Sequence, residues 1–406
     1  MKIGFNKLDI TPQTAVYQAG YNRNKQSVGV LDAIEINTIV FESSFKKIVF
    51  CLLDAIIIED VVIQLVKQKV QKTFGIAKTD ITIGCIHTHS APAFFKPFFE
   101  DVEIDVDLQQ SLIPQMFQSI TKAIDDLENC SLTISTNTIE GFYGNRNIKD
   151  GIANKKFYLI KVFNSNQQLK CIFGNLCCHP TILNGDNLLL SADLFGQLRS
   201  DLQAVHNCPI MLSNSYAGDV STRFYRQLEG VAELERVSKG ICQQLTSPDI
   251  ALIIDKIATT SVEQTYLFDA RYDTDHKKMK QYYTDMLLST SNQNAKIAIQ
   301  KTLTTLKHKE NAGPMQLSLT SNIYLLNNLL IISLPGDITT NLGQKIEKAL
   351  SGYTVIILGY CENYSNYFVS ASDYGKYFES TITRLAKGNA DIFINQVIES
   401  AKNLLK

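Results

Sequence analysis

Residues 81–90 read ITIGCIHTHS, and this stretch carries the clearest fold signal and the clearest chemical signal of the chain. The β-branched run 81–86 predicts a buried strand that leads directly into His87 and His89. Pro92 follows and makes further strand pairing unfavourable. Because alternate residues of a strand share one face, we expect the imidazoles of His87 and His89 to point to the same side.

Strand-like and helix-like segments alternate on both sides of this stretch. Two serines separate the apolar runs 37–42 and 47–53, which predicts a hairpin. The segments 59–73 and 108–127 have apolar residues at helical spacing. Further strands are expected at 131–138, 156–162, 168–176, 209–212, 250–260, 317–325, 328–334 and 354–358, and further helices at 192–205, 228–245, 339–350 and 390–405. Because hairpins interrupt the alternation, the pattern predicts an α/β protein with mixed β-sheets layered with helices.

Residues 265–312 differ in composition from the rest of the chain. They are rich in Lys, Gln, Asp and Thr and have helical periodicity at 279–288 and 295–306, so we expect a surface helical excursion there. A length of 406 residues allows two or three domains, but no Gly-, Pro- or Ser-rich linker divides the chain. The candidate metal ligands described below span 87–364, so we expect residues 1–406 to form one large domain.

The composition excludes several classes of protein. Hydrophobic residues make up 45% and charged residues 19% of the chain, which is typical of a globular protein and not of a disordered one. Lys and Arg total 39 and Asp and Glu total 40, so a net charge of −1 provides no electrostatic basis for binding nucleic acid or an anionic membrane. Neither GxGxxG nor GxxxxGK(S/T) occurs, which argues against dinucleotide and P-loop sites.

Several features predict a cytoplasmic protein. The nine cysteines include no CxxC pair, and a reduced environment suits them best. Residues 1–9 contain no apolar segment of a signal peptide. The longest apolar run, 48–58, is interrupted by Asp54 and is shorter than the roughly 20 residues that span a bilayer. We therefore expect no transmembrane segment and a cytoplasmic location.

Three of the six histidines follow predicted strands. His87 and His89 come after 81–86, and His179 comes after 168–176, where Pro180 ends strand pairing. A catalytic zinc ion typically takes three protein ligands and a water, and convergent imidazoles suit such a site. The alternative is that each histidine is an ordinary buried or turn-capping residue, as a lone histidine more often is.

Other polar residues also follow strand-like runs. Arg146 lies between two asparagines in a predicted turn, where it could bind a carboxylate or a developing oxyanion, or simply lie at the surface. Ser221 could be a nucleophile, but no GxSxG elbow surrounds it, so an ST-turn or a helix cap is favoured. Asp337 either caps the helix expected from residue 339 or is a carboxylate ligand. The tyrosines of 359–374 either serve an oxyanion or a metal, or form a packing patch.

Taken in order, these motifs resemble those of the neutral/alkaline (non-lysosomal) ceramidase family. Residues 87–92, HTHSAP, resemble the family's HTHSGP signature with alanine in place of glycine, and this is the most specific of the matches. The resemblance extends over about residues 3–385. The other matching segments are 4–12 with its DITP sequence, 19–21, 145–146, 179–181 with Asn184, 218–221, 334–337 and 359–379.

The resemblance implies a zinc-dependent amide hydrolase that acts on an N-acyl substrate, either ceramide or a smaller amide. Zinc activates water and polarises a carbonyl, which is the chemistry that amide hydrolysis needs. The implied zinc ligands are His87, His179, Asp337 and Tyr364. The residues implied to act on the scissile amide are His89, Arg146 and Tyr374, and those implied to contact the substrate are Ser221 and Asn184.

The chain departs from the family's pattern, which leaves two other functions open. Asp337 replaces a glutamate and has a shorter reach, Thr222-Arg223 stands for Pro-Asn, and Ser372-Asp373 stands for Glu-Glu. The secretion signal and the C-terminal immunoglobulin-like domain of the family are not expected here. The alternatives are a zinc-dependent esterase or acyl hydrolase of a small cytosolic substrate, and a non-catalytic descendant of the fold.

Overall fold

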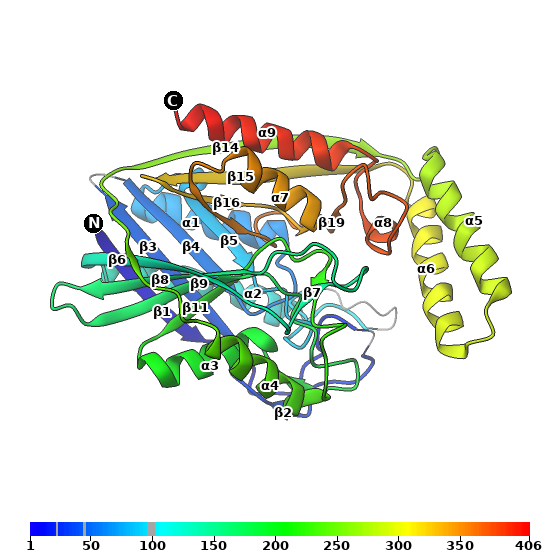
Figure 1. Cartoon of the computed structure of the whole chain (residues 1–406), viewed down its shortest axis with the longest axis horizontal. Helices are drawn as coiled ribbons and strands as arrows, with labels where there is room; N and C mark the ends of the chain where they lie inside the picture. The colour runs from blue at the N-terminus through cyan, green and yellow to red at the C-terminus, as the bar shows by residue number, and fades with distance from the viewer. Residues whose placement is uncertain (22, 44–45, 96–101) are drawn as a thin grey trace.

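The fold is built around a large mixed β-sheet. The computed structural model describes residues 1–21, 23–43, 46–95 and 102–406 (Figure 1). Eight strands follow the order β11-β9-β8-β6-β1-β3-β4-β5, and β13 also pairs with β6. The pairs β4/β5 and β9/β11 are parallel, and the others are antiparallel. The strands are β1 (Lys2–Asp9), β3 (Glu35–Ser43), β4 (Lys46–Leu53), β5 (Ile81–Cys85), β6 (Glu128–Thr138), β8 (Lys156–Asn164), β9 (Leu169–Leu176), β11 (Ile210–Asn214) and β13 (Ile250–Ala251).

A second sheet packs face to face on the first. Its order is β14-β15-β16-β18, with β16 and β18 parallel and the other pairs antiparallel. A buried apolar cluster fills the space between the sheets, where the ring of Phe50 in the large sheet meets that of Tyr324 in the small one at 4.9 Å. The strands are β14 (Ile257–Phe268), β15 (Met315–Leu326), β16 (Leu329–Ser333) and β18 (Thr354–Leu358).

Helices cover the outer faces of both sheets, which gives four layers (Figure 1). On the large sheet lie α1 (Asp60–Phe74), α2 (Val106–Asp125) and α3 (Leu194–His206), with α4 (Gly230–Gln243) packed on α3. On the small sheet lie α7 (Thr340–Ala349) and α9 (Asn389–Leu404). The mixed α/β class predicted from the sequence is therefore confirmed. None of the described helices has both the length and the hydropathy needed to cross a bilayer.

Within the two main sheets, three strands differ from the prediction. β1 lies in the middle of the large sheet, but its sequence KIGFNKLD alternates apolar and polar residues too weakly to predict a strand. The single strand expected over 250–260 is divided into β13 and β14, and β14 continues to Phe268. The hairpin turn expected at 43–44 lies partly outside the described residues. The extent of the domain, 1–406, stays a prediction.

The helical excursion forms as predicted, although it begins after β14 and not at residue 265. Helices α5 (Thr274–Ser289) and α6 (Gln293–Ala312) lie side by side and extend away from the sheets (Figure 1). Helix α6 also contacts the short helix α8 (Glu379–Ile382). A small apolar cluster, which includes Met279, Leu306 and Tyr367, connects the excursion to the main body.

The carboxyl ends of strands from both sheets meet at one place. The backbone N–H of Gly359, just after β18, donates to the carbonyl of Asn214 at the end of β11, with 2.9 Å between the atoms. Gly84 in β5 forms an isolated bridge with Cys361, which also follows β18. Loops from the two sheets are thereby fastened together at the point where the candidate site residues lie.

Lys309 on α6 is a buried cation that makes the stability of the protein depend on pH. Burial lowers the pKa of its ammonium group to about 7, with the negative charge of Asp273 opposing the shift and the positive charge of Arg384 adding to it. Because this folded-state pKa lies below the ordinary value of about 10.5, the unfolded chain binds more protons between these two pH values. The free energy of unfolding therefore rises with pH between about 7 and 10.5. Below about pH 7, Lys309 is charged in the folded protein as well, and its burial destabilises the fold to the full extent.

We expect Lys309→Met to raise the free energy of unfolding at pH 6.5 by at least ~1 kcal/mol, since methionine fills the site without a charge to bury. The gain should shrink as the pH rises to 9.5. Urea denaturation at both pH values measures it, with Lys307→Met, at an exposed position on the same helix, as the control. A gain that is the same at both pH values would contradict this account of Lys309.

Candidate metal centre

His87 is oriented by the loop that follows β4. The backbone N–H of His87 donates to the carbonyl of Ala55 at 2.9 Å, and its Nδ1 lies 2.7 Å from the carbonyl oxygen of Ile56. A carbonyl only accepts, so Nδ1 carries the hydrogen and Nε2 has a free lone pair. His87 adopts a left-handed φ of 70° two residues beyond the end of β5. The expectation that His87 and His89 share one face of a strand is therefore wrong, because neither residue lies in the strand.

His179 is held in the same way by the segment that follows β11, from Ala217 in the loop to Val220 in the next short strand. Its backbone N–H donates to the carbonyl of Val220 at 2.9 Å, and its Nδ1 lies 2.8 Å from the carbonyl oxygen of Ala217. Its Nε2 is buried and has no hydrogen-bond partner among the described residues. The rings of His87 and His179 meet at right angles with their centroids 4.9 Å apart. Both free nitrogens therefore face a common space.

Asp337 brings a carboxylate into that space. It lies in β17 (Asp337–Ile338), which pairs in parallel with β19 (Tyr367–Phe368), and its side chain is fully buried. Its Oδ1 is 3.5 Å from Nε2 of His87 and 3.5 Å from Nε2 of His179, and makes no hydrogen bond to the described residues. Its Oδ2 accepts a hydrogen bond from the hydroxyl of Tyr364.

Asp337 does not cap the helix that follows it. α7 begins at Thr340, and its first turn is satisfied by Asp219, whose Oδ1 accepts from the backbone N–H of Thr340 at 2.8 Å and from its hydroxyl at 2.7 Å. The capping alternative for Asp337 is thus wrong. Its carboxylate is free for the other role that the sequence allowed.

These residues fit a divalent cation. A buried carboxylate oxygen and a buried imidazole nitrogen without partners are costly, and a cation between them would satisfy both. His87, His179 and Asp337 supply two imidazole nitrogens and a carboxylate oxygen, which are donors that zinc accepts, and the hydroxyl of Tyr364 lies beside them. Ligand atoms of His87, His89 and His179 all lie within 4.8 Å of one another, so this part of the chain could hold a metal ion.

Burial favours the neutral form of His87 and His179, which is the form in which an imidazole can bind a metal. Loss of solvent lowers the pKa of His87, with the negative charge of Asp337 opposing this shift. Burial lowers the pKa of His179 still further, and the positive charge of Arg146 adds to the effect. Burial and the charge of Asp337 raise the pKa of Tyr364 well above its ordinary value, so its hydroxyl stays protonated while it donates to Asp337.

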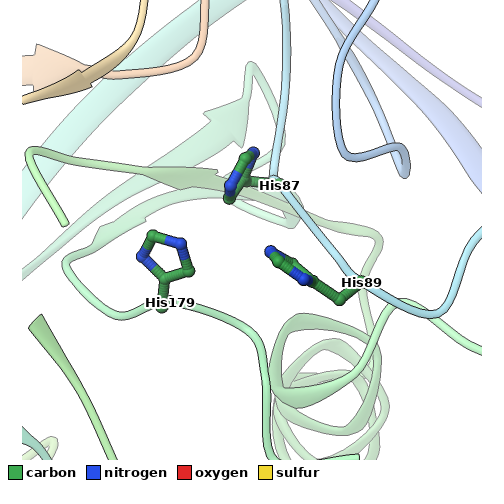
Figure 2. A group of neighbouring side chains, drawn as sticks. All are labelled: His87, His89 and His179. Carbon is green, nitrogen blue, oxygen red and sulfur yellow. The ribbon is translucent and has the colours of Figure 1, made fainter. Parts of the chain in front are cut away.

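His89 is the third imidazole at the centre. Figure 2 shows its ring beside those of His87 and His179. The ring centroids of His87 and His89 are 5.1 Å apart, and neither ring nitrogen of His89 has a partner among the described residues. Burial, and then the nearby His87 and Arg146, lower the pKa of His89 well below its usual value. The neutral form of His89 is therefore favoured, and no hydrogen bond among the described residues occupies its ring nitrogens.

Arg146 is an ordered part of the site and not a surface residue. It follows β7 (Gly144–Asn145), which pairs with β12 (Val220–Ser221). Its Nε donates to Glu379 at 2.8 Å and its Nη2 donates to the hydroxyl of Tyr367 at 3.0 Å. Nη1 has no partner within the described ranges.

Tyr367 and Glu379 are site residues that the sequence argument did not assign. The ring of Tyr367 lies parallel to that of His179, with 6.4 Å between centroids, and its hydroxyl accepts from Arg146. Glu379 is almost fully buried and pairs with Arg146. Both residues belong to the segment 359–379 that resembles the family, but many polar residues there offered no way to select them.

The remaining predicted residues lie outside the cluster of imidazoles. The hydroxyl of Tyr374 is 3.3 Å from both Asp273 Oδ2 and the carbonyl of Leu385, so it connects to the helical excursion. Ser221 is buried in β12, and its Oγ accepts from the backbone N–H of Arg223 at 3.2 Å, as the ST-turn alternative predicts. Asn184 is exposed in a turn. The roles predicted for these three residues stay predictions.

The fold resembles that of known ceramidases. The chain matches the crystal structure of neutral ceramidase from Pseudomonas aeruginosa with a TM-score of 0.76 and 16% identity, over 99% of this chain and 75% of that one. It matches a ceramidase complexed with C2 with a TM-score of 0.74 and 15% identity, over 100% of this chain and 75% of that one. No protein-family model matches the sequence, and a search of curated proteins finds no significant match. The neutral-ceramidase-like fold expected from the motifs is therefore confirmed.

We expect the metal to depend on His87, His179 and Asp337. His87→Ala, His179→Ala and Asp337→Ala should each weaken zinc binding by more than the roughly 10–100-fold that the loss of an outer-sphere partner costs. Zinc per protein, measured by plasma mass spectrometry after dialysis against a chelator of known affinity, gives the result. His206→Ala, on α3, is the control. His89→Ala should keep the metal, and loss of zinc from that variant would make His89 a ligand.

Proposed function

We propose that this protein is a zinc-dependent hydrolase that cleaves the amide bond of an N-acyl substrate. The observation that carries the proposal is the set of unpartnered buried atoms at one point, Nε2 of His179, Oδ1 of Asp337 and both ring nitrogens of His89. Unsatisfied polar atoms are rare in folded interiors, so their convergence indicates a site for a ligand. The likeness of the fold to two ceramidase structures supports the same class of reaction.

His87, His179, Asp337 and Tyr364 would hold the zinc ion. When bound, zinc would polarise the scissile carbonyl and activate water. The Nδ1 contacts to two backbone carbonyls would keep the two ligand imidazoles in the tautomer that binds a metal.

Arg146 would stabilise the negative charge that develops on the carbonyl oxygen of the substrate. Its guanidinium is fixed by Glu379 and Tyr367, which leaves Nη1 available as a donor. A donor that is already in place needs little reorganisation during the reaction, and removal of one such donor typically lowers kcat about 10²–10³-fold.

His89 would move the proton. Both of its ring nitrogens lack a hydrogen-bond partner among the described residues, so the ring can accept a proton as water attacks and deliver it to the leaving amine nitrogen. An amide nitrogen is a poor leaving group unless it is protonated, so this role suits amide hydrolysis. We further propose that the substrate is a small molecule, ceramide or a shorter N-acyl amine, and that the protein acts in the cytoplasm.

We expect the zinc-loaded protein to hydrolyse an N-acyl amine faster than it does after chelation of the metal. Arg146→Gln should lower kcat about 10²-fold or more, because a donor to the developing negative charge is lost. The zinc content should not change, because the hydrogen bonds of the Arg146 side chain go to Glu379 and Tyr367 and not to the proposed zinc ligands. Product amine, measured by mass spectrometry, gives the rates, and the control is Arg271→Gln, an exposed arginine paired only with Asp269 among the described residues.

The substrates should be an N-acyl and an O-acyl compound of matched acyl length, each in a short-chain form and a ceramide form. Turnover of the ester alone would replace the proposal with the esterase alternative. Stoichiometric zinc without turnover of either substrate would favour a non-catalytic descendant of the fold.

A further inference from the structure

Arg23 is a buried arginine that contacts the backbone at His89. Its side chain is 3% exposed, and its Nη1 donates to the carbonyl of His89 at 2.6 Å and to that of Ala19 at 3.0 Å. Its Nη2 donates to the carbonyl of Asn184 at 2.9 Å and reaches the hydroxyl of Ser90 at 3.4 Å. One guanidinium thus connects three segments of the chain, around residues 19, 89 and 184.

The rest of segment 18–21 also contacts the segment that carries His89. The backbone N–H of Ala19 donates to the carbonyl of Ala91 at 2.9 Å, and the amide of Gln18 donates to the carbonyl of Ser90 at 3.2 Å. The ring of Tyr21 lies 5.3 Å from that of His89. Gly20 has a left-handed φ of 89°, and a Cβ there would lie 2.7 Å from Cβ of His89. Only glycine allows the two backbones to come this close.

A purely stabilising role does not account for Arg23. Within the described residues it has no carboxylate partner at salt-bridge distance, and its Nε is buried without any acceptor. A buried charge that is satisfied only by neutral carbonyls stabilises a fold less than an apolar side chain of similar volume. Arg23 instead fixes the relative positions of several backbone carbonyls, because the donors of its guanidinium lie in one plane.

His89 depends on such a contact more than its neighbours do. The rings of His87 and His179 are oriented by carbonyls on their Nδ1 atoms, but no hydrogen bond of the described residues orients the ring of His89. The backbone N–H of His89 reaches only the carbonyl of Pro180, at a long 3.5 Å. The hydrogen bond from Arg23 is therefore the shortest one that fixes this residue.

We propose that Arg23 is a positioning residue that holds His89 in place for proton transfer. The proposal rests on the function proposed above, in which His89 carries the proton. Arg23 has no hydrogen bond to the predicted metal ligands, and its direct contact with the proposed proton-transfer residue is the hydrogen bond to the backbone carbonyl of His89. A displacement of about 1 Å at a reacting group can lower the rate about 10²-fold, which sets the size of the effect.

The first test compares kcat, KM and zinc content in three variants of the zinc-loaded protein. Arg23→Gln should lower kcat about 10²-fold, with KM changed less than about 3-fold and zinc unchanged. Arg23→Lys should be intermediate, because an ammonium group cannot bridge the same carbonyls in one plane. Arg236→Gln is the matched control, since Arg236 on α4 also donates to a backbone carbonyl, that of Tyr225. A kcat of Arg23→Gln within about 3-fold of the parent protein overturns the proposal.

Chemical rescue separates positioning from general damage to the fold. Millimolar guanidinium should restore part of the kcat of Arg23→Ala, because it can occupy the space left by the side chain, and should not raise that of His89→Ala. Gly20→Ala should displace His89 in another way, because the added Cβ would push the backbone at residue 20 away from that at His89. It should lower kcat while Arg23 is intact. Loss of kcat in proportion to loss of folded protein in all these variants would overturn the proposal.

A spectroscopic measurement keeps this proposal distinguishable from the proposed function. The chain has six histidines, so ¹³Cε1-labelled histidine gives a resolvable set of signals that His89→Gln assigns. In Arg23→Gln the signal of His89 should broaden or divide, and in Arg236→Gln it should not change. If the parent protein hydrolyses no substrate but the signal responds, the function fails and the positioning role stands. If the parent is active and the signal is unchanged, the positioning role fails alone.

Discussion

Two backbone carbonyls determine which way the imidazoles of this site face. The oxygens of Ile56 and Ala217 each accept from Nδ1 of one histidine, so His87 and His179 present their Nε2 lone pairs to Asp337. Both carbonyls lie in loops just after strands of the large sheet. Asp337 and Tyr364 follow strands of the small sheet, so the donor set forms only when the two sheets pack together. The site is therefore a property of the sandwich and not of either sheet alone.

The electrostatics of the centre follow from the same packing. Asp337 is a buried carboxylate. The described contacts of its side chain are two imidazoles and one tyrosine hydroxyl, and in their neutral forms these groups do not balance its charge. The nearby cation Arg146 is already paired with Glu379. Burial lowers the pKa of all three histidines, so they do not compensate Asp337 by becoming charged. A bound cation would balance the carboxylate and use the unpartnered atoms at once, which is why the arrangement makes more sense as a metal centre than as a buried polar cluster.

The sequence was sufficient for the layers and for the main side chains that meet at the candidate site, but not for the contacts that orient them. Strong periodicity located α1, α2 and the hairpin of β15 and β16, whereas the short alternation of β1 was too weak to be recognised. The pairing of His87 with His89 was found for the wrong reason, since a left-handed turn and not strand periodicity brings the rings together. Arg23 could not be selected, because its function depends on carbonyls from segments about 66 and 161 residues away in the chain. Every residue has a backbone carbonyl, so the sequence does not indicate which residues accept hydrogen bonds from such a side chain.

The aspartate at position 337 is the sharpest departure from the family's pattern, and the backbone around it offers a physical compensation. An aspartate has one methylene fewer than a glutamate, so its backbone must lie closer to the imidazoles to reach them. Gly336 permits this, because a Cβ there would collide with the carbonyl of Asn366 and the ring of Phe368 in the paired segment. The backbone N–H of Asp337 donates to the carbonyl of Asn366 at 3.0 Å, which fixes β17 at this short separation. Oδ1 consequently lies 3.5 Å from each of the two Nε2 atoms, so the three atoms are close enough together to bind one cation. The close packing of β17 thus compensates for the shorter side chain of Asp337. A glutamate at this position would be too long for the space between β17 and the two imidazoles.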